Sequence, residues 1–416
     1  MINVYYFHRQ PPVLICLSTN LREPDYLTSC SMIRKRKNNF IAWLARPFWG
    51  RGFGNQPDLV LLVVVGFLLF FGLLFLSSAS STLAFGKHHD TYFFVKQQLL
   101  HGILPGLLLF YIALRINYKV YEKLAYLFLI VSLILLLLVV FTNLGNQYGT
   151  ATSWINLGGI SFQPSEFVKL FFILFLADWL SKKGNRIKNF KTGTLPFVII
   201  LSIISVLIIK QPDIGTLIII ALIALAMFFA SGAKWSHLAA IISVGLAGLL
   251  VLIKAAPYRL SRFTAWLNPD IDPRGIGWQI KQSLIAVGSG GWLGLGLGDS
   301  RQKSYLPMPA NDSIFAIIAE EIGFIFTLCF LALFVILMMR GFYIIRNAPD
   351  NFAKLTALGI TVWLSTQIFI NIAGIIQLLP LTGVPLSFVS LGGSNLVVTL
   401  VSIGILANIS RFTNQR

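Results

Sequence analysis

Apolar stretches of membrane-spanning length recur along the chain between residues 58 and 410, separated by short polar segments. Each approaches the roughly 20 residues that an α-helix needs to cross the hydrocarbon core of a bilayer. The short alternating segments of a transmembrane β-barrel do not fit this pattern. The pattern predicts an all-α polytopic membrane protein with about ten transmembrane helices, at residues 58–78, 93–114, 122–141, 165–180, 195–209, 214–231, 237–254, 312–339, 354–378 and 386–410.

The segments between these spans differ in charge, and the difference predicts the orientation of the chain. Basic residues are concentrated in four alternate loops, which contain Arg115 and Lys119, five lysines and arginines between residues 181 and 194, Lys234, and Arg340 with Arg346. The intervening loops 79–92, 142–164 and 379–385 carry only Lys87 between them. Because cytoplasmic loops are enriched in Lys and Arg, we expect both termini in the cytoplasm and the long loop 255–311, between spans 7 and 8, outside.

The two ends of the chain differ from its apolar part. Residues 1–57 are polar and contain the basic run 34–37, while the first long apolar stretch is too long for the core of a cleavable signal peptide. We expect residues 1–57 to form a flexible cytoplasmic extension, residues 58–411 to form the transmembrane domain, and residues 412–416 to form a cytoplasmic tail.

Composition agrees with this interpretation. Only 12% of the 416 residues are charged, against about 25% in soluble domains. The net charge of +18 would point to nucleic acid in a soluble protein. In a membrane protein, basic loops and anionic headgroups explain it, so no nucleic-acid partner is expected and membrane lipid is. Three cysteines and five histidines show no ligand spacing, so no metal site and no cofactor are identified.

Ionisable residues near apolar spans are candidates for function, because a charge at the bilayer centre costs about 2.5–3.5 kcal/mol. Glu166 and Lys169 are three residues apart at the start of the fourth span and therefore share a helix face. They could form a structural ion pair, or Lys169 could bind a phosphate. Trp154, in the preceding loop, is expected to anchor that loop at the headgroup level.

The long loop 255–311 supplies a second group of candidates. Arg259 and Arg262 follow the seventh span, and Gln302 and Lys303 follow the glycine-rich run 288–298. The glycine spacing does not match a dinucleotide-binding motif, so we expect these glycines to allow close backbone packing against other helices. The basic residues would suit an anionic, lipid-linked substrate. Simple attraction to lipid headgroups is the alternative.

Asp312 lies where a proline-containing loop enters the eighth span. Capping the helix is the plain structural role for an aspartate at this position. A carboxylate at the edge of a low-dielectric region should also have a raised pKa, which suits a general base. Glu320 and Glu321 lie deeper in the same span, where we expect them to pack against polar groups.

Several motifs resemble the SEDS family (shape, elongation, division and sporulation), and the division type, FtsW, in particular. The resemblance runs from about residue 57 to 412. It rests on Trp154–Gly158, Gln163–Lys169, Gln211–Thr216, Tyr258–Arg262, Gln279–Leu284, Gly296–Lys303, Phe315–Gly323, Pro380–Ser394 and Asn408–Arg411.

The resemblance implies an enzyme of the bacterial cytoplasmic membrane that polymerises lipid II into glycan strands at the outer face during cell division. It implies that Asp312 is the general base. Arg259, Arg262, Lys169 and Lys303 are then candidates for stabilising the charge of the pyrophosphate. A divalent cation could assist the leaving group. A class B penicillin-binding protein, a transpeptidase, is the expected partner.

The sequence departs from the family pattern beside the candidate base. A glutamate and a histidine common in the family are replaced by Met308 and Ala310, and Leu391 and Asn395 replace a tyrosine and a serine. Two other functions therefore stay open. One is a lipid II flippase, which should place ionisable groups along a path through the bilayer. The other is a non-catalytic scaffold that recruits the transpeptidase.

Overall fold

The computed structural model describes residues 56–141, 145–148, 151–157 and 160–413. The predicted extension 1–57, apart from its last two residues, and the end of the predicted tail lie outside the described residues. The helices are α2 (Leu59–His88), α3 (Phe93–Gln98), α4 (Leu104–Arg115), α5 (Tyr118–Lys123), α6 (Ala125–Phe141), α7 (Pro164–Lys183), α8 (Leu195–Lys210), α9 (Ile214–Ala230), α10 (Trp235–Lys254), α11 (Pro257–Leu267), α12 (Ile276–Ser289), α13 (Ile314–Arg346), α14 (Asn351–Ile375) and α15 (Gly393–Ser410). The short π and 3-10 segments are η2 (Leu99–Ile103), η3 (Gly184–Lys188), η4 (Phe190–Thr194), η5 (Pro269–Ile271) and η6 (Gln302–Ser304).

Each predicted span coincides with a helix, and the all-α membrane class is confirmed. In the described part of the chain, seven helical segments are long and apolar enough to cross a membrane. Helices α6 and α9 are shorter but apolar, and α7 is a 20-residue helix that contains Glu166, Lys169 and Asp178. The last predicted span was placed too early: α15 begins at Gly393, because the residues before it form an irregular segment.

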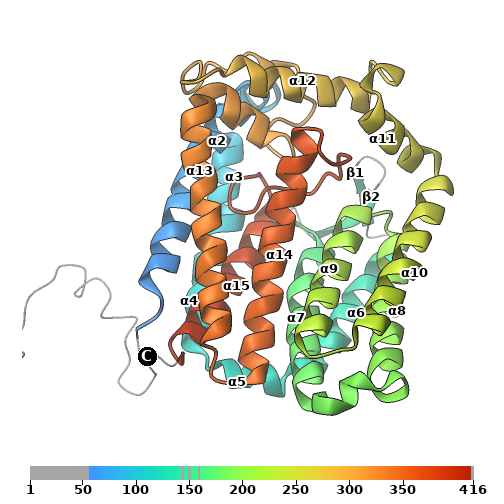
Figure 1. Cartoon of the computed structure of the whole chain (residues 1–416). Coiled ribbons are helices and arrows are strands. Elements are labelled where there is room, and N and C mark those ends of the chain that lie inside the picture. Colours follow the sequence, from blue (N-terminus) through green and yellow to red (C-terminus); the bar gives the residue numbers. More distant parts are fainter. Residues whose placement is uncertain (1–55, 142–144, 149–150, 158–159, 414–416) are drawn as a thin grey trace, which may run out of the picture. The chain divides into compact units, whose positions relative to one another are not determined.

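Helices α7, α14 and α15 form the most buried part of the bundle, whereas α10 exposes nearly all of its side chains. Figure 1 shows α12 across one end of the bundle and α5 at the other. Small residues let α15 approach α4 closely: a Cβ at Gly106 would lie 2.6 Å from Leu400 Cδ1, and one at Gly404 would lie 2.7 Å from the carbonyl oxygen of Phe110. Such contacts replace the hydrophobic driving force that helices lack in lipid.

A small antiparallel sheet lies between α6 and α7, where the sequence predicted only a loop. Its strands are β1 (Gly145–Tyr148), β2 (Ala151–Leu157) and β3 (Ile160–Phe162), in the order β1-β2-β3. Trp154 pairs with Asn146 across β1 and β2, and Ile155 pairs with Phe162 across β2 and β3. The sheet delivers the chain to Gln163, directly before α7.

The glycine-rich run packs against a break in α13, as its composition predicted. Gly323 has φ +72° and interrupts the helix. Loop residues replace the lost helical partners: Leu295 N donates to the carbonyl of Glu320 (3.0 Å), and Phe324 N donates to the carbonyl of Gly291 (2.9 Å). A Cβ at Gly294 would lie 2.1 Å from the Glu321 carbonyl oxygen, so the approach requires glycine.

Candidate functional site

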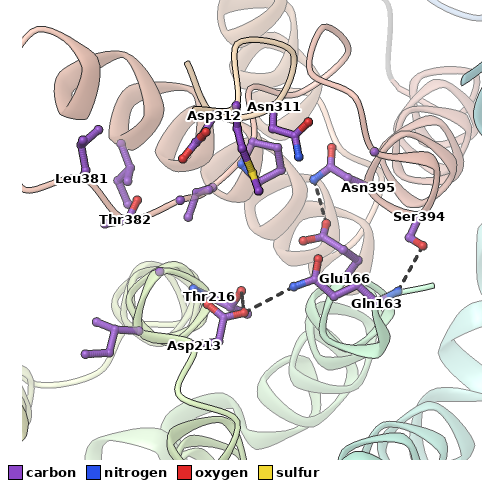
Figure 2. Close-up of a pocket in the computed structure, with 18 of the residues that line it drawn as sticks. Gln163, Glu166, Asp213, Thr216, Asn311, Asp312, Leu381, Thr382, Ser394 and Asn395 are labelled. Atoms are coloured by element: carbon purple, nitrogen blue, oxygen red, sulfur yellow. Dashed lines mark hydrogen bonds between the residues drawn. The ribbon is translucent and has the colours of Figure 1, made fainter. Parts of the chain in front are cut away.

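A cavity of about 1520 Å³ opens among the helix ends near Asp312. Its walls come from α3, η2, α4, the sheet, α7, α9, α10, α11, α12, α14 and α15, together with the segments before α9, α13 and α15. Figure 2 shows several polar residues of its lining, including Glu166, Asp213, Asp312 and Asn395. Five of the eight predicted site residues line it: Trp154, Glu166, Arg259, Arg262 and Asp312.

Asp312 is held at the cavity by its backbone and has a free carboxylate oxygen. Asn371 Nδ2 donates to the carbonyl oxygens of Asp312 (2.9 Å) and Val384 (2.8 Å), which fixes the segment before α13 against the segment before α15. The Oδ1 atom of Asp312 is buried and accepts no hydrogen bond from the described residues. A Cβ at Gly383 would lie 4.0 Å from Oδ2. Oδ1 is thus buried without a partner, while the residue as a whole is partly exposed and lines the cavity.

The surroundings of Asp312 raise the pKa of its carboxyl group. Burial is the main cause, because it disfavours the charged form, while the positive charge of Arg262 acts in the opposite direction. Asp312 does not accept the helix-capping bond for which its position is suited, and Ser313 is the residue at the N-cap of α13. A carboxylate with a raised pKa and an unused oxygen is suited to accept a proton from a hydroxyl group.

Arg259 and Arg262 both come from α11, one turn apart. Arg262 donates to the carbonyl of Leu381 (3.4 Å), beside the segment that contacts Asp312. Arg259 Nε donates to the Tyr258 hydroxyl (2.9 Å), which in turn donates to the carbonyl of Pro212 (3.2 Å). Neither arginine forms an ion pair with a described residue, so the cavity retains two positive charges for an anionic ligand.

Glu166 and Lys169 form the structural ion pair that the sequence offered as one of two interpretations. The distance from Lys169 Nζ to Glu166 Oε1 is 2.9 Å, and both side chains are almost completely buried. Lys169 also donates to Gln367 Oε1 (2.9 Å) and lies 4.9 Å from the centre of the Trp363 ring. Glu166 is part of the cavity lining, whereas Lys169 is not. The ammonium group of Lys169 is occupied by Glu166 and Gln367 behind the lining, and this buried pair is the floor of the cavity.

Gln302 and Lys303 lie in η6, away from the cavity lining. The backbone N–H of Gln302 donates to Glu320 Oε2 (3.3 Å), and Lys303 Nζ donates to the carbonyl of Gly298. Glu320 also accepts bonds from Ser289 and Ser300, so it organises the loop above α13, which confirms the packing role expected for it. A substrate contact at Gln302 or Lys303 stays a prediction for a ligand that extends beyond the cavity.

The sequence reasoning missed several polar residues of the lining. Asp213 caps α9 through Thr216 N (2.9 Å) and accepts from Gln163 Nε2 (3.5 Å). Asn395 Nδ2 donates to Glu166 Oε2 (2.8 Å). Both residues could have been found from the motifs that contain them, because a polar residue at the start of an apolar helix is conspicuous. Asp213 lies directly before α9, and Asn395 lies in the first turn of α15. Among the described residues, no group of three His, Cys, Asp or Glu side chains could hold a metal ion.

The fold and the cavity define a class: a multi-pass α-helical membrane protein whose large cavity at the helix ends is lined by three acidic residues, Glu166, Asp213 and Asp312, and by two arginines. Comparison with known families gives the particular one. The family model described as "Cell cycle protein", for FtsW, RodA and SpoVE, matches residues 58–415. The chain belongs to this family.

Relatives with assigned names agree with that membership. Stage V sporulation protein E of Bacillus subtilis (strain 168) is 41% identical over 360 residues, which are 86% of this chain and 98% of that protein. A "Probable peptidoglycan glycosyltransferase FtsW" of Trichlorobacter lovleyi is 40% identical over 356 residues, covering 85% of this chain and 93% of that protein.

Solved structures share the fold. One, described as "Structural coordination of polymerization and crosslinking by a peptidoglycan synthase complex", aligns with a TM-score of 0.72 at 26% identity, over 86% of this chain and 99% of that chain. The crystal structure of the rod shape determining protein RodA of Thermus thermophilus aligns with a TM-score of 0.64 at 25% identity, over 86% and 98%.

Proposed function

We propose that this chain is a peptidoglycan glycosyltransferase that polymerises lipid II at the outer face of the bacterial cytoplasmic membrane, with both termini in the cytoplasm. The carrying observation is Asp312, with an unused oxygen and a raised pKa, in a cavity that also contains Arg259 and Arg262. The names of the FtsW relatives support the reaction class. We propose service in cell division, as the FtsW names suggest, and sporulation is the alternative, because the sporulation protein of Bacillus subtilis is equally similar.

In the proposed reaction, a sugar hydroxyl of the acceptor attacks the anomeric carbon of the donor. The new glycosidic bond forms as the bond from that carbon to the diphosphate oxygen breaks. Asp312 accepts the hydroxyl proton, and undecaprenyl diphosphate leaves with the bonding electron pair. Arg259 and Arg262 offset the charge that accumulates on the diphosphate, an effect that is strengthened in a cavity with little water.

Glu166 is not suited to act as a second base. Both of its carboxylate oxygens accept hydrogen bonds, from Lys169 and from Asn395. Replacing these partners by a substrate proton would leave a buried ammonium without its counter-ion, which is strongly unfavourable. We therefore assign Glu166 and Lys169 to holding the floor of the cavity.

A class B penicillin-binding protein is the partner that we propose. The structural relative with the higher TM-score comes from a peptidoglycan synthase complex that coordinates polymerization and crosslinking. The same structural relative supports the alternative function, a non-catalytic scaffold that recruits the transpeptidase. A flippase has less support, because the cavity lies at one end of the bundle among helix termini.

The test is polymerisation of lipid II by the purified protein, with and without the transpeptidase partner. Wild-type protein is expected to produce glycan strands, and Asp312→Ala is expected to produce none while remaining bound to the partner. Asp270→Ala is the matched control, because Asp270 lies in the same loop but is exposed and paired with Lys281. If wild-type protein binds the partner but makes no glycan, the glycosyltransferase proposal fails and the scaffold function is supported instead.

A further inference from the structure

The cationic groups of the cavity lie on one wall. Among the described residues, both arginines of the lining come from α11, and no lysine is part of the lining. On the wall formed by α7, α15 and the sheet, the charge of Glu166 is balanced by Lys169. The other polar groups of these elements, Gln163, Ser394 and Asn395, are neutral, and the carboxylate of Asp213, at the start of the adjoining α9, accepts from Gln163 Nε2 at 3.5 Å. One wall therefore suits a diphosphate, and the other suits an uncharged polar group.

Asn395 has a fixed orientation on the neutral wall. Its Nδ2 donates to Glu166 Oε2 at 2.8 Å, and a carboxylate can only accept, so the nitrogen must face Glu166. The carbonyl oxygen Oδ1 must then face the other way, and no described residue donates to it. Asn395 is 6% exposed and lines the cavity. An acceptor at the cavity wall without a protein partner favours a ligand that brings an N–H or O–H donor.

Aromatic side chains complete the neutral wall. Trp154 of β2 and Phe162 of β3 line the same cavity. The sheet is tied to the start of α15, because the backbone N–H of Gln163 donates to Ser394 Oγ (3.2 Å). A sugar has an apolar face of C–H groups and an edge of hydroxyl and acetamido groups, so an aromatic surface beside a fixed amide acceptor matches both.

Asp312 lies between the two walls. Figure 2 shows it with Leu381 and Thr382 on one side and with Asn311 and Asn395 on the other. Arg262 donates to the carbonyl of Leu381 on the first side. With the donor diphosphate on the cationic wall and the acceptor sugar on the neutral wall, Asp312 would lie beside the acceptor hydroxyl and the donor carbon that it attacks.

We propose that Asn395 is a specificity-determining residue that binds an acetamido N–H or a hydroxyl of the acceptor sugar, on the wall opposite the donor diphosphate. The inference rests on the proposed glycosyltransferase function and assigns its two substrates to the two walls. Asn395 Oδ1 contacts the sugar, Trp154 packs against its apolar face, and Arg259 and Arg262 bind the donor diphosphate.

Two substitutions at Asn395 separate sugar recognition from mere support of Glu166. Asn395→Leu keeps the volume and removes both donor and acceptor, whereas Asn395→Asp keeps an acceptor oxygen and loses the donor to Glu166. Under the proposal, the KM for lipid II rises about tenfold in Asn395→Leu, the scale of one hydrogen bond, and rises less in Asn395→Asp. If Asn395 only supports Glu166, the order reverses, because Asn395→Asp adds a second buried carboxylate beside it.

Binding of undecaprenyl diphosphate to the same preparations monitors the donor wall. Its Kd is expected to be unchanged in Asn395→Leu and to rise in Arg262→Ala. Asn347→Leu, at the far end of α13 where the amide donates to the Tyr343 carbonyl, is the matched control and should match wild type in both assays.

An unchanged KM in Asn395→Leu, the reversed order of Leu and Asp, or weakened diphosphate binding in Asn395→Leu would each overturn the inference. A wild-type protein that binds the diphosphate but makes no glycan would instead overturn the proposed function.

Discussion

At the scale of the residue, Asp312 must lose its proton before it can act as a base. Burial raises its pKa above the ordinary 3.8 of an aspartate, so the inactive, protonated form persists to higher pH than it would in water. The rate of polymerisation should therefore rise with pH through the raised pKa of Asp312, with its midpoint above 3.8. A pH profile of kcat/KM, which reports groups of the free enzyme, measures this midpoint.

Arg262 provides a second prediction on the same profile. Its positive charge lowers the pKa of Asp312 and so partly offsets burial. Replacing it in Arg262→Gln should raise that pKa and move the rising limb to higher pH, in addition to weakening diphosphate binding. A limb that stays in place, or moves to lower pH, would show that Asp312 is not the group that titrates.

The buried pair of Glu166 and Lys169 predicts an effect on stability. Removing one partner of a buried ion pair typically destabilises a protein by about 3–5 kcal/mol. Lys169→Met should therefore lower the melting temperature, and the double variant Glu166→Gln/Lys169→Met should recover part of the loss because no unpaired charge remains. Thermal unfolding in detergent measures both, and a double variant less stable than Lys169→Met would contradict this account of the pair.

At the scale of the element, the helices were predicted well from the sequence, because a membrane-spanning helix requires a run of about 20 apolar residues that is easy to recognise. The sequence did not predict the sheet, because strands of three to seven residues in a polar loop leave no periodic pattern. It also treated span 8 as continuous, whereas Gly323 breaks α13. The break depends on residues of a distant loop that replace the helical hydrogen bonds, and composition alone does not place them.

The docking of the glycine-rich run on α13 can be tested with a matched pair of substitutions. Gly294 and Gly298 both have positive φ, at +86° and +90°, but only Gly294 is in close contact with α13. Gly294→Ala should destabilise the loop more than Gly298→Ala, because its Cβ would collide with the Glu321 carbonyl. Protease sensitivity of the 255–311 loop compares them, and equal sensitivity would contradict the proposed role of close packing.

At the scale of the whole molecule, the site was predicted in part. Asp312, Arg259 and Arg262, which line the cavity, were selected from the sequence because a charge beside an apolar span stands out, and their roles stay predictions. Lys169 has the same signal, but only the folded structure places its ammonium behind the lining with Gln367 and Trp363. Asn395 was missed as a site residue because a neutral amide in a polar turn has many ordinary structural roles.

The orientation of the chain predicts which loops a membrane-impermeant reagent reaches. With the native cysteines Cys16, Cys30 and Cys329 replaced, Ser304→Cys should react with such a maleimide in intact cells, since Ser304 is exposed in the 255–311 loop. Lys188→Cys, in the basic loop 181–194, should react only after the cells are opened. The reverse labelling pattern would place the cavity on the cytoplasmic side and would contradict the proposal that lipid II is polymerised at the outer face.

The most direct measurement is single-turnover polymerisation of lipid II by Asp312→Asn, with undecaprenyl diphosphate binding measured on the same preparation. Asparagine keeps the shape of the side chain but cannot accept the hydroxyl proton as a base. The rate is expected to be at least about 100-fold below wild type, with diphosphate binding unchanged. A rate close to wild type would contradict the assignment of Asp312 as the base on which the account depends.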